Sequence, residues 1–228
     1  MVNNYRVFGI NLASEIELPE LLPIDFPQAD VCLKIGEVPK QLQNPAKIRK
    51  SFEVSCDQVL IRAKNVGRFL IERGKRITIV PEHGTTEKTI RLFVLGSCLG
   101  VILHQRNLFP IHGSVIDTPT GAVIVCGKPG IGKSTTAATL AKRGYRILSD
   151  DIAALKIDGK SIQVESSYPQ LKLSGNSLNH INEDPERLEE IRPGIGKRAF
   201  KLQALFKAKP SQVTALAWLW RQQNTSPI

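Results

Sequence analysis

The chain has 228 residues, of which 42% are apolar and 23% charged, and its formal net charge is +10. A chain of this length and composition buries a sizeable core, which excludes disorder throughout and fits one large domain or two small ones. The charge calls for an anionic partner, such as a nucleotide, a nucleic acid, a membrane surface or an acidic protein. Only 6% of the residues are aromatic, and no basic motif with interleaved aromatics occurs, so nucleic acid is disfavoured as a partner.

The cysteines and the apolar runs indicate the compartment. The four cysteines are scattered, without the paired spacing of a metal site or a disulfide framework. The first residues are polar, so we expect no signal peptide, and the longest apolar run, 92–103, is too short to span a bilayer. The sequence therefore predicts a reduced, soluble, cytoplasmic protein with no membrane partner.

The N-terminal part of the chain is predicted to be rich in β-strands. Its runs are β-branched or alternate between apolar and polar residues, and Pro, Gly, Asn and Asp separate them. The expected strands are 5–10, 31–35, 59–63, 69–72 and 76–80. After Thr86, apolar residues at helical spacing along 90–103 predict a helix that is apolar nearly all round and therefore buried. We place a boundary after this helix, between a β-rich region, 1–108, and a second unit, 109–228.

The second unit has the pattern of an α/β core. Its expected strands are 112–117, 122–126, 146–149, 152–157 and 161–165. A hairpin turn is expected at 118–121 and a helix at 133–143, which Gly144 ends. The stretch 166–193 is less regular, and the last ten residues, 219–228, look frayed.

A glycine-rich loop matches the pattern GxxxxGK[ST] without a gap. Its residues are Gly127, Lys128, Pro129, Gly130, Ile131, Gly132, Lys133 and Ser134, with Thr135 next in the helix. Glycines let backbone N–H groups turn toward phosphate oxygens, and the start of the following helix favours an anion. We therefore predict a nucleoside triphosphate here, with Lys133 at the β and γ oxygens and the Ser134 hydroxyl on Mg²⁺. A glycine-rich turn without a ligand is the alternative.

An acidic pair, Asp150 and Asp151, ends the strand that follows the loop helix. In an open α/β sheet, strand carboxyl ends and helix N-termini share the ligand edge, so the pair is expected to face the same phosphates. Adjacent carboxylates on extended backbone point to opposite faces, so one is expected to act on the nucleophile and the other to orient metal or scaffold. A simple turn cap is the alternative. His112, on the strand before the loop strand, is a candidate to polarise a general base or to stay positive beside the phosphates, with a purely structural role as the alternative.

Together these residues resemble the catalytic core of the HPr kinase/phosphorylase family. The resemblance covers 112–151 and rests on the His112-Gly113 pair, the loop, the basic end of the loop helix before Gly144, and Asp150-Asp151. That bacterial family phosphorylates a serine of a small phosphocarrier protein. The resemblance implies a P-loop core like that of HPr kinase and phosphoenolpyruvate carboxykinase, the cofactors ATP and Mg²⁺, and a homo-oligomer.

The resemblance also implies roles for the site residues. Asp150 with His112 would form the proton-accepting unit, and Lys133 would hold the phosphates. Ser134 and an acidic group, here Asp151, would hold Mg²⁺. Glu165 is the candidate for the acidic metal ligand that the family carries further along.

The sequence departs from the family downstream of the acidic pair. The family's second signature, which is associated with phosphorolysis, has its nearest candidate at 192–198, where the order of residues differs. The N-terminal segment is similar instead to stand-alone serine kinases, some of which occur in lasso-peptide clusters and modify a precursor's C-terminal serine. Such relatives continue further past a stretch like 196–198, so we expect a core shortened at its C-terminus.

The sequence thus predicts an ATP- and Mg²⁺-dependent serine kinase, without phosphorylase activity, whose acceptor is a serine hydroxyl of a peptide or small protein. Two alternatives stay open. A nucleotide-binding regulatory module would bind ATP with little catalysis, and a metabolite kinase would use the same loop with a small acceptor.

Overall fold

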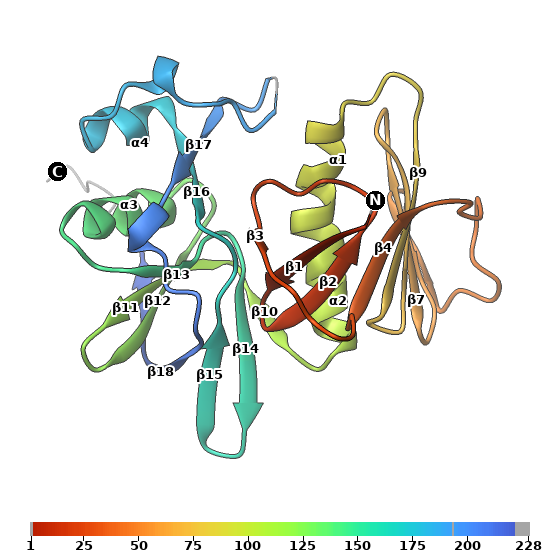
Figure 1. Cartoon of the computed structure of the whole chain (residues 1–228), viewed down its shortest axis with the longest axis horizontal. Helices are drawn as coiled ribbons and strands as arrows, with labels where there is room; N and C mark the ends of the chain where they lie inside the picture. The colour runs from red at the N-terminus through yellow and green to blue at the C-terminus, as the bar shows by residue number, and fades with distance from the viewer. Residues whose placement is uncertain (1, 193, 222–228) are drawn as a thin grey trace, which may run out of the picture.

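The structure, a computed structural model, describes residues 2–192 and 194–221. Two halves lie side by side, an N-terminal half built on one long sheet and a C-terminal half that carries the glycine-rich loop (Figure 1). Mixed parallel and antiparallel pairing occurs in both large sheets. In the described part of the chain, no helix has the length and hydropathy needed to cross a membrane.

The N-terminal sheet has nine strands in the order β3-β1-β2-β4-β9-β8-β7-β6-β5. Their bounds are β1 Asn3–Val7, β2 Ile10–Ser14, β3 Leu22–Pro23, β4 Val31–Ile35, β5 Lys47–Ile48, β6 Phe52–Val54, β7 Gln58–Ala63, β8 Gly67–Glu72 and β9 Arg76–Pro81. The four strands predicted from 31 to 80 are confirmed. The single strand predicted at 5–10 is wrong, because the chain turns at Phe8 and Gly9, which both have positive φ, and pairs β1 with β2.

One continuous helical segment lies against this sheet. It consists of α1 Glu87–Phe93, a π-helical turn η1 Val94–Cys98, and α2 Leu99–Gln105. The Thr86 hydroxyl caps its start by accepting from the backbone N–H of Thr89 at 3.3 Å. The predicted burial is confirmed for one face, where Leu99 and Ile102 are fully buried in the same core as Phe69 of β8.

The C-terminal half contains a seven-stranded sheet, a two-stranded sheet and two short α-helices. The larger sheet has the order β10-β14-β15-β18-β12-β11-β13, with β10 Phe109–Ile111, β11 Gly113–Thr118, β12 Gly121–Gly127, β13 Ile147–Ser149, β14 Ala153–Asp158, β15 Ser161–Glu165 and β18 Ser211–Leu219. The smaller sheet pairs β16 Gln170–Ser174 with β17 Lys197–Lys201. The helices are α3 Lys133–Lys142 and α4 Gly175–His180, with 3₁₀ turns η2 Pro185–Arg187 and η3 Gln203–Leu205.

The expected hairpin at 118–121 and the loop helix are confirmed. Two sequence predictions for the later part of the chain need correction. The stretch 166–193, expected to be irregular, contains β16 and α4. The frayed end was expected to include residue 219, yet β18 extends to Leu219 and pairs in parallel with β12. The rest of that prediction concerns mainly 222–228, which lie outside the described residues.

The two halves share a core. Ala154 and Tyr168 of the C-terminal half pack in the main hydrophobic cluster of the N-terminal half. The backbone N–H of Phe8 donates to the carbonyl of Ser166 at 2.7 Å, and Lys88 pairs with Glu189 at 2.6 Å. The arrangement is consistent with a P-loop core preceded by a β-rich region, and the division at residue 108 stays a prediction.

Candidate active site

The glycine-rich loop joins the end of β12 to the start of α3. Ala137, Ala138 and Ala141 of α3 are fully buried against Ile116 and Val125, which fixes the helix on the sheet. The small alanine side chains allow α3 to pack closely on the sheet. The first turn of α3 then lies directly after the loop, with its N–H groups at the loop end of the helix. The unpaired N–H groups of that turn carry partial positive charge, so the loop is a candidate anion site.

Two loop glycines have a structural requirement. Gly132 has φ of +109° at the position that begins α3, a conformation that L side chains rarely adopt. A Cβ on Gly127 would lie 2.7 Å from the carbonyl oxygen of Leu219 in β18. The loop backbone is therefore set by its glycines and by the neighbouring strand.

Lys133 is 6% exposed although it carries a charge. Its ammonium donates to the carbonyls of Gly127 at 3.0 Å and Lys128 at 3.2 Å. Both acceptors belong to the loop itself, so the ammonium lies inside the curve of the loop. If phosphate oxygens occupied the loop, the ammonium could donate its hydrogen bonds to them instead of to the two carbonyls.

Asp150 is buried at the loop, immediately after β13. Its Oδ1 accepts from the hydroxyls of Ser114 at 2.6 Å and Ser134 at 2.9 Å, and its Oδ2 accepts from the backbone N–H of Lys172 at 3.2 Å. Burial, and then the charge of Asp151, raise the pKa of Asp150 above its ordinary range, and the three hydrogen bonds oppose this shift only in part. A carboxylate with a raised pKa is a stronger base when it is ionised.

Asp151 has a different environment from its neighbour. Its φ is +70°, and its carboxylate pairs with the ammonium of Lys172 at 2.7 Å. Burial would raise the pKa of Asp151, but the contact with Lys172 outweighs it and lowers the pKa. The left-handed backbone of Asp151, and not the extended backbone that the sequence suggested, directs the two adjacent carboxylates to different partners. Their separate roles stay a prediction.

His112 meets the acidic pair through the backbone. Its Nδ1 lies 2.8 Å from the carbonyl oxygen of Asp151. A carbonyl only accepts, so Nδ1 carries a proton, and Nε2 of the neutral ring is left as the acceptor. The next residue must be small, because a Cβ on Gly113 would lie 2.8 Å from the carbonyl oxygen of Val125. The His112-Gly113 pair thus contacts the acidic pair through His112 and the loop strand β12 through Gly113.

The structure brings most of the predicted residues together but changes two placements. The carboxylate that contacts Ser134 is that of Asp150, whereas Asp151, predicted as the metal ligand, is paired with Lys172. Glu165 lies elsewhere, since a Cβ on Gly9 would meet its carboxylate at 2.8 Å. Its position at the end of β15 is set by the β14–β15 hairpin, which carries it toward the N-terminal half.

Two functional candidates escaped the sequence analysis. Lys172 is buried on β16, and burial would lower its pKa, but Tyr168 and Asp151 outweigh this and raise it. A lysine between Leu171 and Leu173 in a short apolar run was the available signal for a buried charge. Ser114, fully buried, directly follows the His-Gly pair and was distinguishable only by that position.

The donor set fits Mg²⁺ bound together with phosphates. Over residues 2–192 and 194–221, no group of three or more His, Cys, Asp or Glu side chains could hold a metal ion. The Ser134 hydroxyl and the Asp150 carboxylate, 2.9 Å apart, are hard oxygen donors of the kind that Mg²⁺ takes alongside phosphate oxygens.

Thr135 lies on the other side of the helix start, where its hydroxyl contacts that of Ser177 at 2.8 Å.

Comparison with known proteins supports the family that the sequence suggested. Residues 106–172 match the family model of the HPr Serine kinase C-terminal domain. HPr kinase/phosphorylase of Geobacillus sp. (strain WCH70) is 35% identical over 116 residues, which cover 50% of this chain and 35% of that protein. The same-named protein of Prosthecochloris aestuarii (strain DSM 271 / SK 413) is 29% identical over 149 residues, covering 64% of this chain and 38% of that protein.

The match spans little more than a third of the length of these relatives. Among solved structures, that of the Hpr(Ser) kinase/phosphatase from Coxiella burnetii aligns with a TM-score of 0.37 at 16% identity, over 53% of this chain and 70% of that one. The residues matched by the family model include the loop, the acidic pair and Lys172. They support an HPr kinase-like family for this chain.

Proposed function

We propose that this chain is an ATP- and Mg²⁺-dependent serine kinase that transfers the γ-phosphoryl group to a serine hydroxyl of a peptide or small protein. The observation that carries the proposal is the position of Asp150. Its carboxylate is bonded to the loop residue Ser134 and buried beside the ammonium-bearing loop. This position supports a role for Asp150 as the proton acceptor beside a phosphate-binding loop.

The nucleotide would bind through the loop. Backbone N–H groups of the loop and the Lys133 ammonium would hold the β and γ oxygens, and the start of α3 would favour their charge. Mg²⁺, when bound, neutralises charge that develops on those oxygens. The Ser134 hydroxyl would hold the ion from the loop side, and Asp150 lies next to that hydroxyl.

The chemical step is an in-line displacement at the γ-phosphorus. The acceptor serine gives its proton to the Asp150 carboxylate as its oxygen forms a bond to phosphorus, and the bond to the β-phosphate bridging oxygen breaks to release ADP. Ser114 holds Oδ1 of Asp150 in place during this step. His112, oriented by the carbonyl of Asp151, would present Nε2 toward the reacting groups, and the Asp151–Lys172 pair would keep that carbonyl in position.

The finer parts of the proposal concern the acceptor and the reverse reaction. We expect a polypeptide acceptor, with a precursor peptide bearing a C-terminal serine as the first candidate, and a homo-oligomeric enzyme. We also expect no phosphorylase activity, because the stretch 192–198 differs in order from the signature tied to phosphorolysis. Incubating the phosphorylated product with phosphate should then leave it intact.

The test is transfer from ATP with Mg²⁺ to three classes of acceptor: a phosphocarrier protein, precursor peptides with a C-terminal serine, and hydroxyl metabolites. Mass spectrometry reports the gain of one phosphoryl group. Asp150→Asn should lower transfer roughly 10²- to 10⁴-fold, the usual contribution of a general base, while retaining binding of a non-hydrolysable ATP analogue. Asp158→Asn, at the exposed end of β14, is the matched control and should transfer normally.

Each other outcome identifies a different function. Undiminished transfer by Asp150→Asn would remove this residue as the base. Tight ATP binding without transfer to any acceptor would indicate a regulatory module. Transfer to metabolites alone would indicate a small-molecule kinase.

A further inference from the structure

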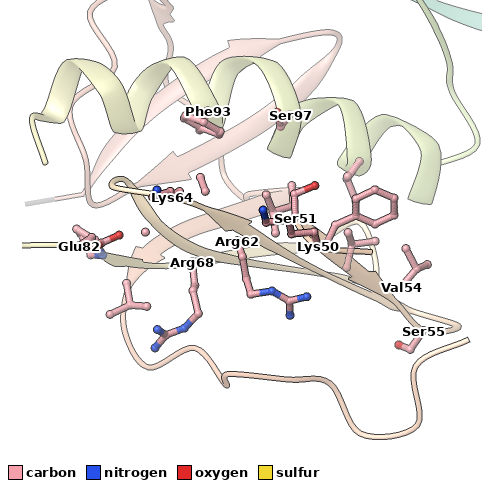
Figure 2. A pocket seen from close by; sticks show the side chains of 18 of the residues that line it. Lys50, Ser51, Val54, Ser55, Arg62, Lys64, Arg68, Glu82, Phe93 and Ser97 are labelled. Atoms are coloured by element: carbon pink, nitrogen blue, oxygen red, sulfur yellow. The ribbon is translucent and has the colours of Figure 1, made fainter. Parts of the chain in front are cut away.

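A long groove lies between the helical segment and the β6–β8 part of the N-terminal sheet, in the half of the molecule opposite the loop (Figure 2). Its volume is about 1680 Å³. The floor consists of side chains on β6 and β7 that are only partly buried: Phe52, Val54, Val59, Ile61 and Ala63. Phe93, Ser97 and Val101 form the helical wall.

The floor is apolar because strand residues alternate between faces. Ile61 faces the helix, whereas the next residue, Arg62, bonds to Glu53 on the far side at 2.5 Å. Figure 2 shows the Arg62 and Arg68 guanidinium groups pointing away from the helix. Both arginines are among the lining residues, but their charged groups lie on the side of the sheet away from the helix.

The helical segment covers only part of the sheet. Phe69 of β8 and Ile77 of β9 are fully buried beneath it, while the floor on β6 and β7 remains partly exposed. An apolar sheet face is normally buried against a second layer. The helix layer of this half therefore has room for one more element, beside α1 and α2.

The rim of the groove is basic. Lys50 and Lys64 are exposed along the sheet side, and His104 is exposed on α2, with Glu82 as the acid among the lining residues. An occupant with acidic residues on its flanks would complement this rim. A second copy of this chain, which has a net charge of +10, would bring like charge instead.

The geometry favours a helix as the occupant. The volume exceeds the roughly 300–1000 Å³ of ordinary small-molecule pockets. Backbone groups of β6 and β7 are paired within the sheet, so the floor offers side chains and no free hydrogen-bonding edge. A strand laid on this floor would leave its own N–H and C=O groups unpaired on apolar surface, whereas a helix pairs them internally.

We propose that this groove docks an acidic amphipathic helix of a partner polypeptide. Apolar residues at i, i+3 or i+4, and i+7 of that helix would lie on the floor formed by Ile61 and its neighbours. Its flanking Asp and Glu residues would face Lys50 and Lys64. The π-helical turn Val94–Cys98 of the wall is a further irregularity of the kind found at functional sites. The proposal stands independently of phosphoryl transfer.

The test uses two fluorescein-labelled model helices with the same leucine stripe, one flanked by Glu and the other by Lys. Fluorescence anisotropy with the full chain should show at least tenfold tighter binding of the acidic helix. Ile61→Glu should weaken that binding at least tenfold. The double variant Lys50→Glu/Lys64→Glu should reverse the preference toward the Lys-flanked helix, whereas Lys156→Glu/Lys160→Glu, which makes the same charge change on the exposed β14–β15 hairpin, should not.

The surface double variant keeps the test decisive if Ile61→Glu fails to fold, which loss of a cooperative urea-unfolding transition would reveal. Equal affinity for the two helices, or no reversal in Lys50→Glu/Lys64→Glu, would overturn the proposal. Binding to anionic phospholipid vesicles that Ile61→Glu abolishes, without binding of the acidic helix, would assign the groove to a membrane surface. Loss of a dimer in Ile61→Glu by sedimentation would assign it to a second copy.

Discussion

Lys172 organises the acidic turn through both its backbone and its side chain. Its N–H holds Oδ2 of Asp150, and its ammonium holds the carboxylate of Asp151. The left-handed backbone of Asp151 costs energy for a residue with a side chain, and the ion pair offsets that cost. One lysine thus fixes the positions of both carboxylates and, through the carbonyl of Asp151, of His112.

Replacing Lys172 by Met should leave the Asp151 carboxylate without its ion-pair partner. We expect a loss of unfolding free energy near the lower end of about 3–5 kcal/mol, because Asp151 remains partly exposed. Lys172→Arg should restore much of the stability and the transfer rate. Urea unfolding and steady-state kinetics measure the two effects.

A double-mutant cycle separates this pairing from simple loss of packing. If the charge is the cause, adding Asp151→Asn to Lys172→Met should recover stability, since no unpaired carboxylate then remains. Additive losses in the double variant would show that the pairing with Asp151 is not the cause of the lost stability.

At the scale of elements, the loop depends on two strands that are far apart in the sequence. β12 delivers Gly127 to the loop, and β18 runs parallel to it with Leu219 directly opposite. Gly127 is required there for two reasons: β18 approaches too closely for a Cβ, and its φ of +146° is one that L side chains rarely adopt. The loop is therefore part of the sheet and not an independent motif.

Gly127→Ala should disturb both the sheet and the proposed nucleotide site. The added Cβ would meet the Leu219 carbonyl at 2.7 Å and Ile131 at 3.0 Å, so we expect a loss of about 1–3 kcal/mol and at least tenfold weaker binding of an ATP analogue. Gly100→Ala in α2 is the control, because no atom lies within 4 Å of the added Cβ. It should gain up to about 1 kcal/mol. Calorimetry and urea unfolding test both, and equal behaviour of the two variants would contradict the packing argument.

The sequence predicted elements whose signals are local. The strand–loop–helix unit, the 118–121 hairpin and the helix after Thr86 were all found, since periodicity and glycine spacing encode them directly. Lys172 was missed, because its role depends on the position of β16 next to the Asp150-Asp151 turn, which is a tertiary contact. The direction of the Glu165 side chain was also hidden from the sequence, because register along β14 and β15 decides which way its carboxylate faces; its role as a metal ligand stays a prediction.

At the scale of the molecule, Asp117 joins three parts of the C-terminal half. Its carboxylate contacts Lys207 at 2.7 Å and Arg146 at 3.0 Å, and it accepts from the hydroxyl of Ser211 at the start of β18 at 3.3 Å. Burial would raise the pKa of Asp117, but the two cations outweigh it and hold the pKa below its ordinary value of 3.8.

This depressed pKa gives the fold a defined acid dependence. Above pH 3.8 the ionised group contributes its full stabilisation, roughly 1.5–3 kcal/mol for charged hydrogen bonds, and the contribution is lost as the pH falls through the lower folded pKa. Asp117→Asn should therefore be less stable than the parent near neutral pH, and the two should converge in acid. Urea unfolding over a pH series measures the difference in unfolding free energy between parent and variant. A difference that does not change with pH would contradict the linkage. Asp25→Asn, on an exposed loop, should show no gap.

The parallel pairing of β18 with β12 has a consequence for how the protein is made. On the ribosome, the loop and its strand emerge long before Ser211–Leu219. A nascent chain stalled ahead of Ser211 would hold β12 without the neighbour that shapes Gly127. Affinity for the triphosphate should then arise only late in synthesis, so the nucleotide would bind a finished core and take no part in guiding its assembly.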